Sequence, residues 1–102
     1  MKIPDKVRIG GIDYAVEYEN RLMNGGGQGL RGQISYSNAT IKLDPNAQDE
    51  QGKKQTLLHE IMHGIAEHFD LPVRTDEDTI DKLAKGLYMV IVDNPDMFKS
   101  DD

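Results

Sequence analysis

One short segment, His59-Glu60-Ile61-Met62-His63, combines residue types and a spacing that can do metal chemistry. Two histidines four residues apart lie on one helical face, about 6 Å apart, so both imidazoles can reach one tetrahedral Zn²⁺ ion. Glu60 lies beside that face, where its carboxylate can take a proton from a zinc-bound water without becoming a ligand. The segment therefore predicts Zn²⁺ held by His59 and His63, with Glu60 as a general base.

A catalytic zinc site normally has three protein ligands, so a third residue is needed. His68 is five residues past His63, about 140° around the helix, and is expected to point away into solvent. Glu67 lies one turn beyond His63 and is more typical of a solvated side chain. A second helix that folds back over a short loop would bring Glu77 or Asp81 near the histidines, and the residues alone leave both open.

Alternating apolar residues predict two β-hairpins in the first half of the chain, over residues 6–18 and 34–43. The glycine-rich segment between them, residues 20–32, is expected to be a mobile loop. It contains a GxGxxG pattern at 27–32. A strand rather than a helix is expected after that pattern, so a dinucleotide site is rejected.

After residue 50 the apolar period changes from two to that of a helix, which predicts two helices. The first is expected over residues 52–70, and Thr75 or Asp76 can cap the second, which stops at Asn94-Pro95. The predicted apolar stripes are Leu58, Met62, Ile65 and Phe69 in the first helix, and Ile80, Leu83, Leu87, Val90 and Ile91 in the second.

The length of 102 residues, with 37% apolar and 29% charged side chains, fits one globular domain over residues 1–102. Its fold class is expected to be α+β: a small antiparallel sheet of three to four strands, the HExxH helix, and a second, antiparallel helix. Residues 96–102 are expected to form a frayed tail.

Charge and composition limit the partners. A formal net charge of −6 disfavours nucleic acid, because phosphate backbones are repelled. The absence of cysteine leaves only histidine and carboxylate as metal ligands. No leader-like or long apolar run is visible, so no membrane partner and a cytoplasmic location are expected. The protein is expected to be a monomer.

The segment Thr56-Leu-Leu-His-Glu-Ile-Met-His-Gly64, followed by Glu77-x-x-Ile80-x-x-Leu83-Ala84-x-x-Leu87, resembles zinc peptidases of the ImmA/IrrE type and the short zincins called minigluzincins. In these families a "glutamate helix" supplies the third zinc ligand, which the resemblance places at Glu77. The pattern displaced by four residues also fits Asp81-x-x-Ala84-x-x-Leu87, so Asp81 stays open as the alternative. The resemblance implies a minimal zincin-like core with a short sheet ahead of the first helix.

The expected function is that of a zinc-dependent endopeptidase, in which a zinc-bound water attacks a peptide bond and Glu60 is the general base. The resemblance implies a regulatory protein as substrate, such as a repressor of mobile elements in a bacterium or phage. The alternative is a non-catalytic, zinc-stabilised module that binds a protein through its glycine-rich loop and a sheet edge. Glu60 favours catalysis, because a structural zinc site has no use for an acid between its histidines.

Two more features are expected around the site. In zincins of the resembled type an edge strand before the zinc helix holds the substrate, which implies that residues 39–43 pair with an extended peptide. Tyr36 and Tyr88 are candidates for an oxyanion donor, although a place in the core is more typical of both.

Overall fold

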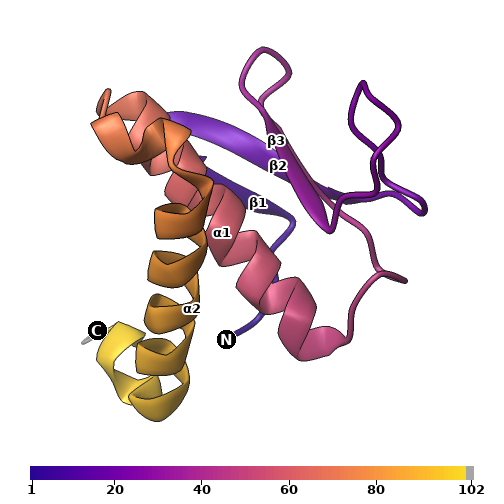
Figure 1. Ribbon diagram of the computed structural model, residues 1–102. Coiled ribbons are helices and arrows are strands. Elements are labelled where there is room, and N and C mark those ends of the chain that lie inside the picture. Colours follow the sequence, from indigo (N-terminus) through magenta and orange to yellow (C-terminus); the bar gives the residue numbers. More distant parts are fainter. Residues whose placement is uncertain (101–102) are drawn as a thin grey trace.

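The first half of the chain forms a four-stranded sheet in the computed structural model, which describes residues 1–100 (Figure 1). The strands are β1 (Lys6–Ile9), β2 (Ile12–Tyr18), β3 (Gly32–Ser35) and β4 (Thr40–Leu43). Both predicted hairpins are confirmed, because β1 pairs antiparallel with β2 and β3 with β4. The predicted α+β class is confirmed as well.

The sheet is mixed rather than purely antiparallel, because its strand order is β1-β2-β4-β3 and β2 runs parallel to β4. Parallel neighbours need a long crossover connection. The glycine-rich segment and β3 together provide it, so the second hairpin inserts β4 beside β2 and leaves β3 outside.

β4 is therefore an internal strand, and the prediction that residues 39–43 form an edge strand is wrong. Ile41 is opposite Val16 of β2 on one side and Ile34 of β3 on the other. An internal strand has no free backbone groups for an incoming peptide. The free edge on this side of the sheet belongs to β3.

The second half of the chain is helical. Its elements are α1 (Glu50–His68), a 3₁₀ helix η1 (Pro72–Thr75), α2 (Glu77–Asp93) and a second 3₁₀ helix η2 (Pro95–Phe98). Asp49 caps α1 by accepting the Gly52 N–H at 2.7 Å, and Asp76, one of the two predicted caps, accepts the Thr79 N–H of α2 at 3.1 Å. Two predicted helices are thus present, and the start and end of α1 lie two residues before those expected.

The predicted tail at 96–102 begins inside η2, and residues 101 and 102 lie outside the described part of the chain. Among the described residues no helix has both the length and the apolar character needed to span a membrane.

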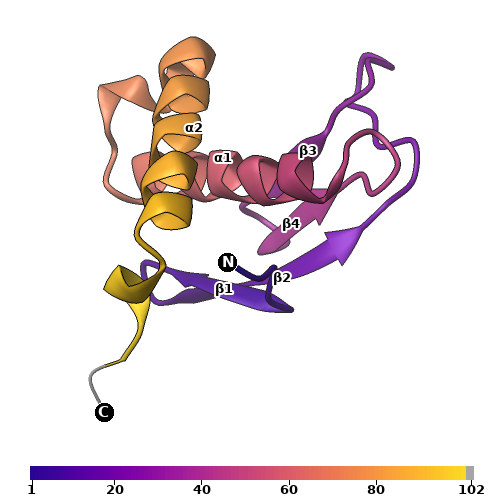
Figure 2. The ribbon, with the colours of Figure 1, turned by 90° about the horizontal axis from the view of Figure 1, so that it is seen from below.

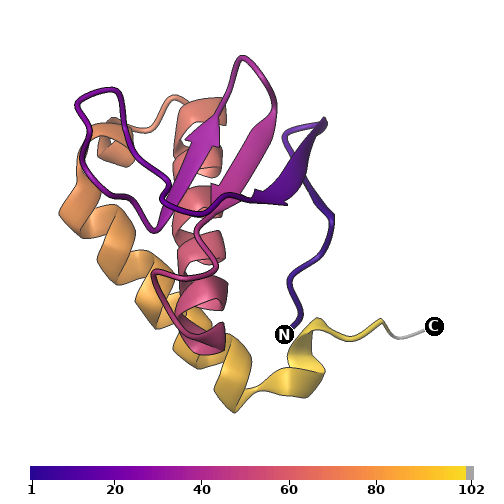
Figure 3. The ribbon, with the colours of Figure 1, turned by 90° about the vertical axis from the view of Figure 1, so that its right-hand side faces the viewer.

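Helix α1 lies across one face of the sheet and α2 packs along α1 (Figures 1 and 3). Figure 2 shows the same layers from below. α1 is buried on two sides: Leu57 packs with Ile41 and Leu43 of β4, and Leu58 packs against Ala84 and Tyr88 of α2. The sheet and α2 thus cover different sides of α1.

The predicted apolar stripes are wrong at three positions. Phe69, Leu83 and Val90 are 65%, 51% and 44% exposed. Phe69 follows the last residue of α1, and the buried residues of α2 are Ile80, Ala84 and Tyr88 instead. The small Ala84 side chain allows the two helices to approach closely. The predicted stripe contains only large apolar residues and therefore lacks Ala84.

The glycine-rich segment has more hydrogen-bonded structure than a mobile loop would have. The Leu30 N–H donates to the Leu22 carbonyl at 2.8 Å, and Met23 and Gly29 form an antiparallel bridge. Leu22 is only 1% exposed, and its N–H donates to the Asp44 carboxylate at 3.2 Å. The segment is therefore fastened to the end of β4.

Candidate metal centre

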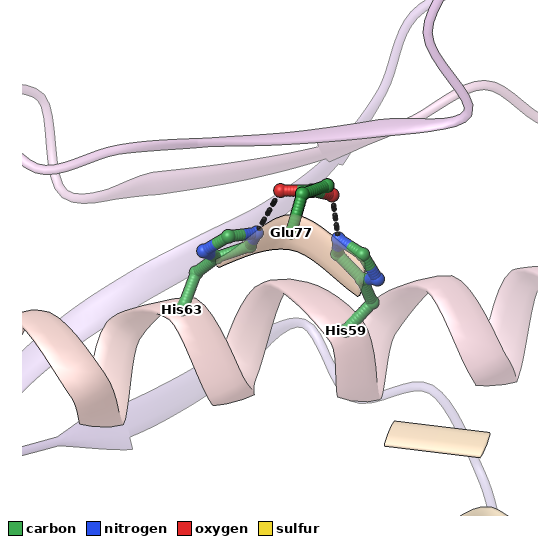
Figure 4. A group of neighbouring side chains, drawn as sticks. All are labelled: His59, His63 and Glu77. Atoms are coloured by element: carbon green, nitrogen blue, oxygen red, sulfur yellow. Dashed lines mark hydrogen bonds and ion pairs between the residues drawn. The ribbon is translucent and has the colours of Figure 1, made fainter. Parts of the chain in front are cut away.

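Three side chains from two helices meet above α1 (Figure 4). Nε2 of His59 lies 2.5 Å from Oε1 of Glu77, and Nε2 of His63 lies 2.8 Å from Oε2 of the same carboxylate. One possible ligand atom from each residue lies within 4.8 Å of the other two. The structure thus brings together the two predicted histidines and the predicted Glu77.

The turn between the helices brings Glu77 to this position. Asp70 adopts a left-handed conformation with φ of 53°, and the Leu71 N–H donates back to the Ala66 carbonyl at 2.9 Å. The η1 turn then reverses the chain, and Asp76 caps the new helix. Glu77 is the first residue of α2, so its side chain lies beside the middle of α1.

Asp81 lies one turn further along α2 and does not join the three facing ligand atoms. Its Oδ1 is 3.2 Å from Nδ1 of His59, and its Oδ2 is 2.8 Å from Nζ of Lys85. The Lys85 ammonium, followed by His59, holds the pKa of Asp81 below its usual range. A proton on Nδ1 that donates to Asp81 leaves the Nε2 lone pair of His59 free for a metal.

Glu60 is buried beside this cluster, with 6% of its surface exposed. Burial raises the pKa of Glu60 to about 7, with His59 lowering it and the Glu77 charge raising it further. A carboxyl group that titrates near neutral pH can accept and return a proton during a reaction. Glu60 thus lies beside the predicted ligands without being one of the three.

The donor set is chemically suited to Zn²⁺. Two imidazole nitrogens and one carboxylate oxygen form the ligand set of one class of catalytic zinc site, in which the fourth position is open. The second ring nitrogen of His59 already has its carboxylate partner in Asp81, an arrangement that fixes ring orientation at metal sites. His59, His63 and Glu77 could therefore hold the ion.

Two depressions adjoin the cluster. The first, called here the loop cavity, has a volume of about 260 Å³ and lies between Arg31 of the glycine-rich segment, Gln55 of α1 and Lys85 of α2. The second, called here the β3 groove, runs along Gln33 and Ile34 to Tyr36. Both are also lined by His59, Glu60 and Glu77, so the candidate centre is open on two sides.

The two candidate tyrosines have different surroundings. Tyr88 is 7% exposed and packs with Leu58 and Ala84, as expected for a core residue. Tyr36 is 42% exposed and lies at the β3 groove, so a core position is wrong for it. Its hydroxyl donates to the His63 carbonyl at 3.2 Å, and burial, followed by the Glu67 charge, raises the pKa of Tyr36 to about 12. The hydroxyl remains a donor at neutral pH.

The other two candidate ligands, His68 and Glu67, lie outside the cluster. His68 and Glu67 are both exposed, and the His68 ring contacts the Phe69 ring edge-to-face with centroids 4.9 Å apart. The expectation that both are surface residues is confirmed.

Gly32 is a site residue that the sequence did not reveal. A Cβ atom at this position would overlap the methyl group of Thr56 and lie 3.2 Å from Oε2 of Glu60. Only glycine lets β3 approach α1 this closely. The local sequence shows only that the segment is rich in glycine, because the requirement comes from a helix more than twenty residues away.

Comparisons with protein-family models, curated proteins and solved structures find no match for this chain.

Proposed function

We propose that the protein is a zinc-dependent endopeptidase with its active site at His59, Glu60, His63 and Glu77. The observation that carries the proposal is a donor set of two histidines and one glutamate beside a buried carboxyl group, open to two depressions. Zn²⁺ in such a site acts as a Lewis acid on the scissile carbonyl and lowers the pKa of water.

The residues of the chain have separate roles in this proposal. His59, His63 and Glu77 would hold the ion, and Asp81 would orient the His59 ring through Nδ1. Glu60 takes a proton from the attacking water and delivers it to the leaving amine, which its position and near-neutral pKa support. Tyr36 turns its hydroxyl from the His63 carbonyl toward the carbonyl oxygen of the substrate.

An extended peptide is the proposed substrate, and β3 is the proposed strand that binds it. β3 pairs with β4 on one side only, and the β3 groove follows it toward the histidines. A peptide could therefore add to the sheet by backbone hydrogen bonds and pass the candidate centre in an extended form. The resemblance to ImmA/IrrE-type peptidases suggests a regulatory protein of the repressor type. Cytoplasmic action as a monomer remains a prediction from the sequence.

The test compares parent protein, Glu60→Gln and Glu67→Gln, each loaded with zinc, on an unfolded protein or peptide library. We expect the parent to cleave and Glu60→Gln to lose about 10²- to 10⁴-fold in rate, because a general base has been removed. Zinc content and melting temperature should not fall. Glu67→Gln is the matched control, because Glu67 is exposed on the same helix.

Two results would contradict the proposal. Absence of zinc uptake from micromolar zinc would show that these residues do not form a zinc site. Equal cleavage by Glu60→Gln and parent would exclude the general-base mechanism. In the second case the non-catalytic, zinc-stabilised binding module would be the better interpretation.

A further inference from the structure

The loop cavity lies directly beside the candidate metal centre. Its walls come from the glycine-rich segment, from the first half of α1 and from α2, and it shares His59, Glu60 and Glu77 with the centre. Its volume of about 260 Å³ is below the range of roughly 300–1,000 Å³ that is typical of small-molecule sites. The cavity is thus of a size to hold one side chain of a peptide whose backbone passes the histidines.

The charged side chains around the loop cavity differ in whether they have an ion-pair partner. The Glu77 carboxylate faces the two histidines, and Asp81 is paired with His59 and with Lys85. Within the described part of the chain, the Arg31 guanidinium has no carboxylate within 4.0 Å. Arg31 is therefore the one cation on this wall that is free to pair with an incoming carboxylate.

The backbone at Arg31 is held in place. Its carbonyl accepts the Asp44 N–H at 2.9 Å and a side-chain N–H of Gln48 at 3.0 Å. These bonds join the loop both to the end of β4 and to the segment before α1. The main chain at Arg31 is thus held in place, while the Arg31 side chain is exposed to solvent.

We propose that the loop cavity binds the side chain of a glutamate or aspartate residue of the substrate, next to the scissile bond, through Arg31. The planar guanidinium offers two parallel N–H donors to a carboxylate. A glutamine side chain of the substrate in this cavity would lack the negative charge, and a lysine side chain would carry the same charge as Arg31. The inference rests on the proposed endopeptidase function and names its substrate class, a peptide with an acidic residue beside the cleaved bond.

The test uses peptide hydroxamates that carry glutamate, glutamine or lysine next to the hydroxamate, which is the zinc-binding group. Each compound is prepared in two forms, with the hydroxamate at one end of the peptide or at the other. Dissociation constants are measured on zinc-loaded parent, Arg31→Gln and Arg21→Gln, together with zinc content. In one of the two orientations we expect the glutamate compound to bind the parent about tenfold more tightly than the glutamine compound. Arg31→Gln should abolish this preference.

Arg21→Gln is the matched control, because Arg21 is exposed at the start of the same segment but does not line the loop cavity. It should keep the preference for glutamate. Equal affinities of the glutamate and glutamine compounds for the parent, or an equal loss in both arginine variants, would overturn the inference and leave the endopeptidase proposal standing. Failure to bind zinc would overturn both.

Discussion

The Nδ1 atom of His59 lies 3.2 Å from Oδ1 of Asp81, while the Nε2 atom of the same ring faces Glu77. The two acids that the sequence left open therefore contact different edges of one imidazole. Glu77 also reaches His63, and Asp81 instead reaches Lys85. The proposed ligand set therefore contains Glu77, and the role proposed for Asp81 is to orient His59.

Replacement of the two acids should weaken zinc binding unequally. Asp81→Ala should lower zinc affinity about 10- to 100-fold, as expected for loss of a residue that orients a ligand. Glu77→Ala should lower it further, because a ligand is lost. Competition with a chromophoric chelator measures both, and Asp78→Ala, an exposed acid paired with Lys82 on the same helix, is the control. The reverse order would make Asp81 the ligand.

Tyr36→Phe should slow peptide cleavage by about 10²-fold without loss of zinc, because one hydrogen-bond donor to the developing oxyanion is removed. The ring itself stays, so kcat should fall more than the affinity for a substrate changes. Steady-state kinetics and zinc analysis check this. Tyr18→Phe is the control, because Tyr18 is 52% exposed and does not line the site. An unchanged kcat would remove Tyr36 from the proposed mechanism.

A peptide-like zinc inhibitor should slow amide hydrogen exchange in β3, because an added strand would pair with its free backbone groups. The other edge strand, β1, is the internal control and should exchange at its original rate. Mass spectrometry of peptic fragments separates the two strands. Protection outside residues 32–35, with β3 unaffected, would show that the peptide does not add to this edge.

Gly32→Ala should lower the free energy of unfolding by about 1–3 kcal/mol, because the new methyl group overlaps Thr56 and approaches Glu60. Gly29→Ala is the control, because a Cβ atom at Gly29 meets nothing within 4 Å. Urea denaturation of the metal-free proteins gives the difference. Equal stabilities of the two variants would show that β3 can move away from α1 at little cost.

The metal-free protein should lose stability in acid as the Asp44 carboxylate is protonated. Its carboxylate accepts the N–H groups of Asn46 and Leu22, and these bonds lower the pKa of Asp44 below the ordinary 3.8. A depressed pKa contributes stability that is complete above the unfolded value and is lost as pH falls through the folded value. Asp44→Asn should therefore be less stable than the parent at pH 7, with the difference shrinking below about pH 3.8.

Urea denaturation across this pH range measures the difference, with exposed Asp5→Asn as the control. A constant difference between parent and Asp44→Asn from pH 7 to pH 3 would contradict the prediction.

The features that could be predicted from the sequence are those governed by neighbours along the chain. The four-residue spacing of His59 and His63 brings both rings to one face of any helix that contains them. Alternation and helical periodicity predict both hairpins and both helices, and Asp76 caps α2 as one of the two predicted caps. These depend on local backbone geometry, which a few consecutive residues determine.

Tertiary packing alone decided which distant residues meet. The parallel pairing of β2 with β4 made β4 internal and gave the free edge to β3, although each hairpin by itself allows several sheet orders. The angle and register of α2 on α1 decided that Glu77 contacts both histidines while Asp81, one helical turn further along, contacts only His59. The glycine-rich segment brought Arg31 and Gly32 to the site because Asp44 and Gln48 hold it there. Such contacts follow from packing across the whole chain, which local periodicity does not encode.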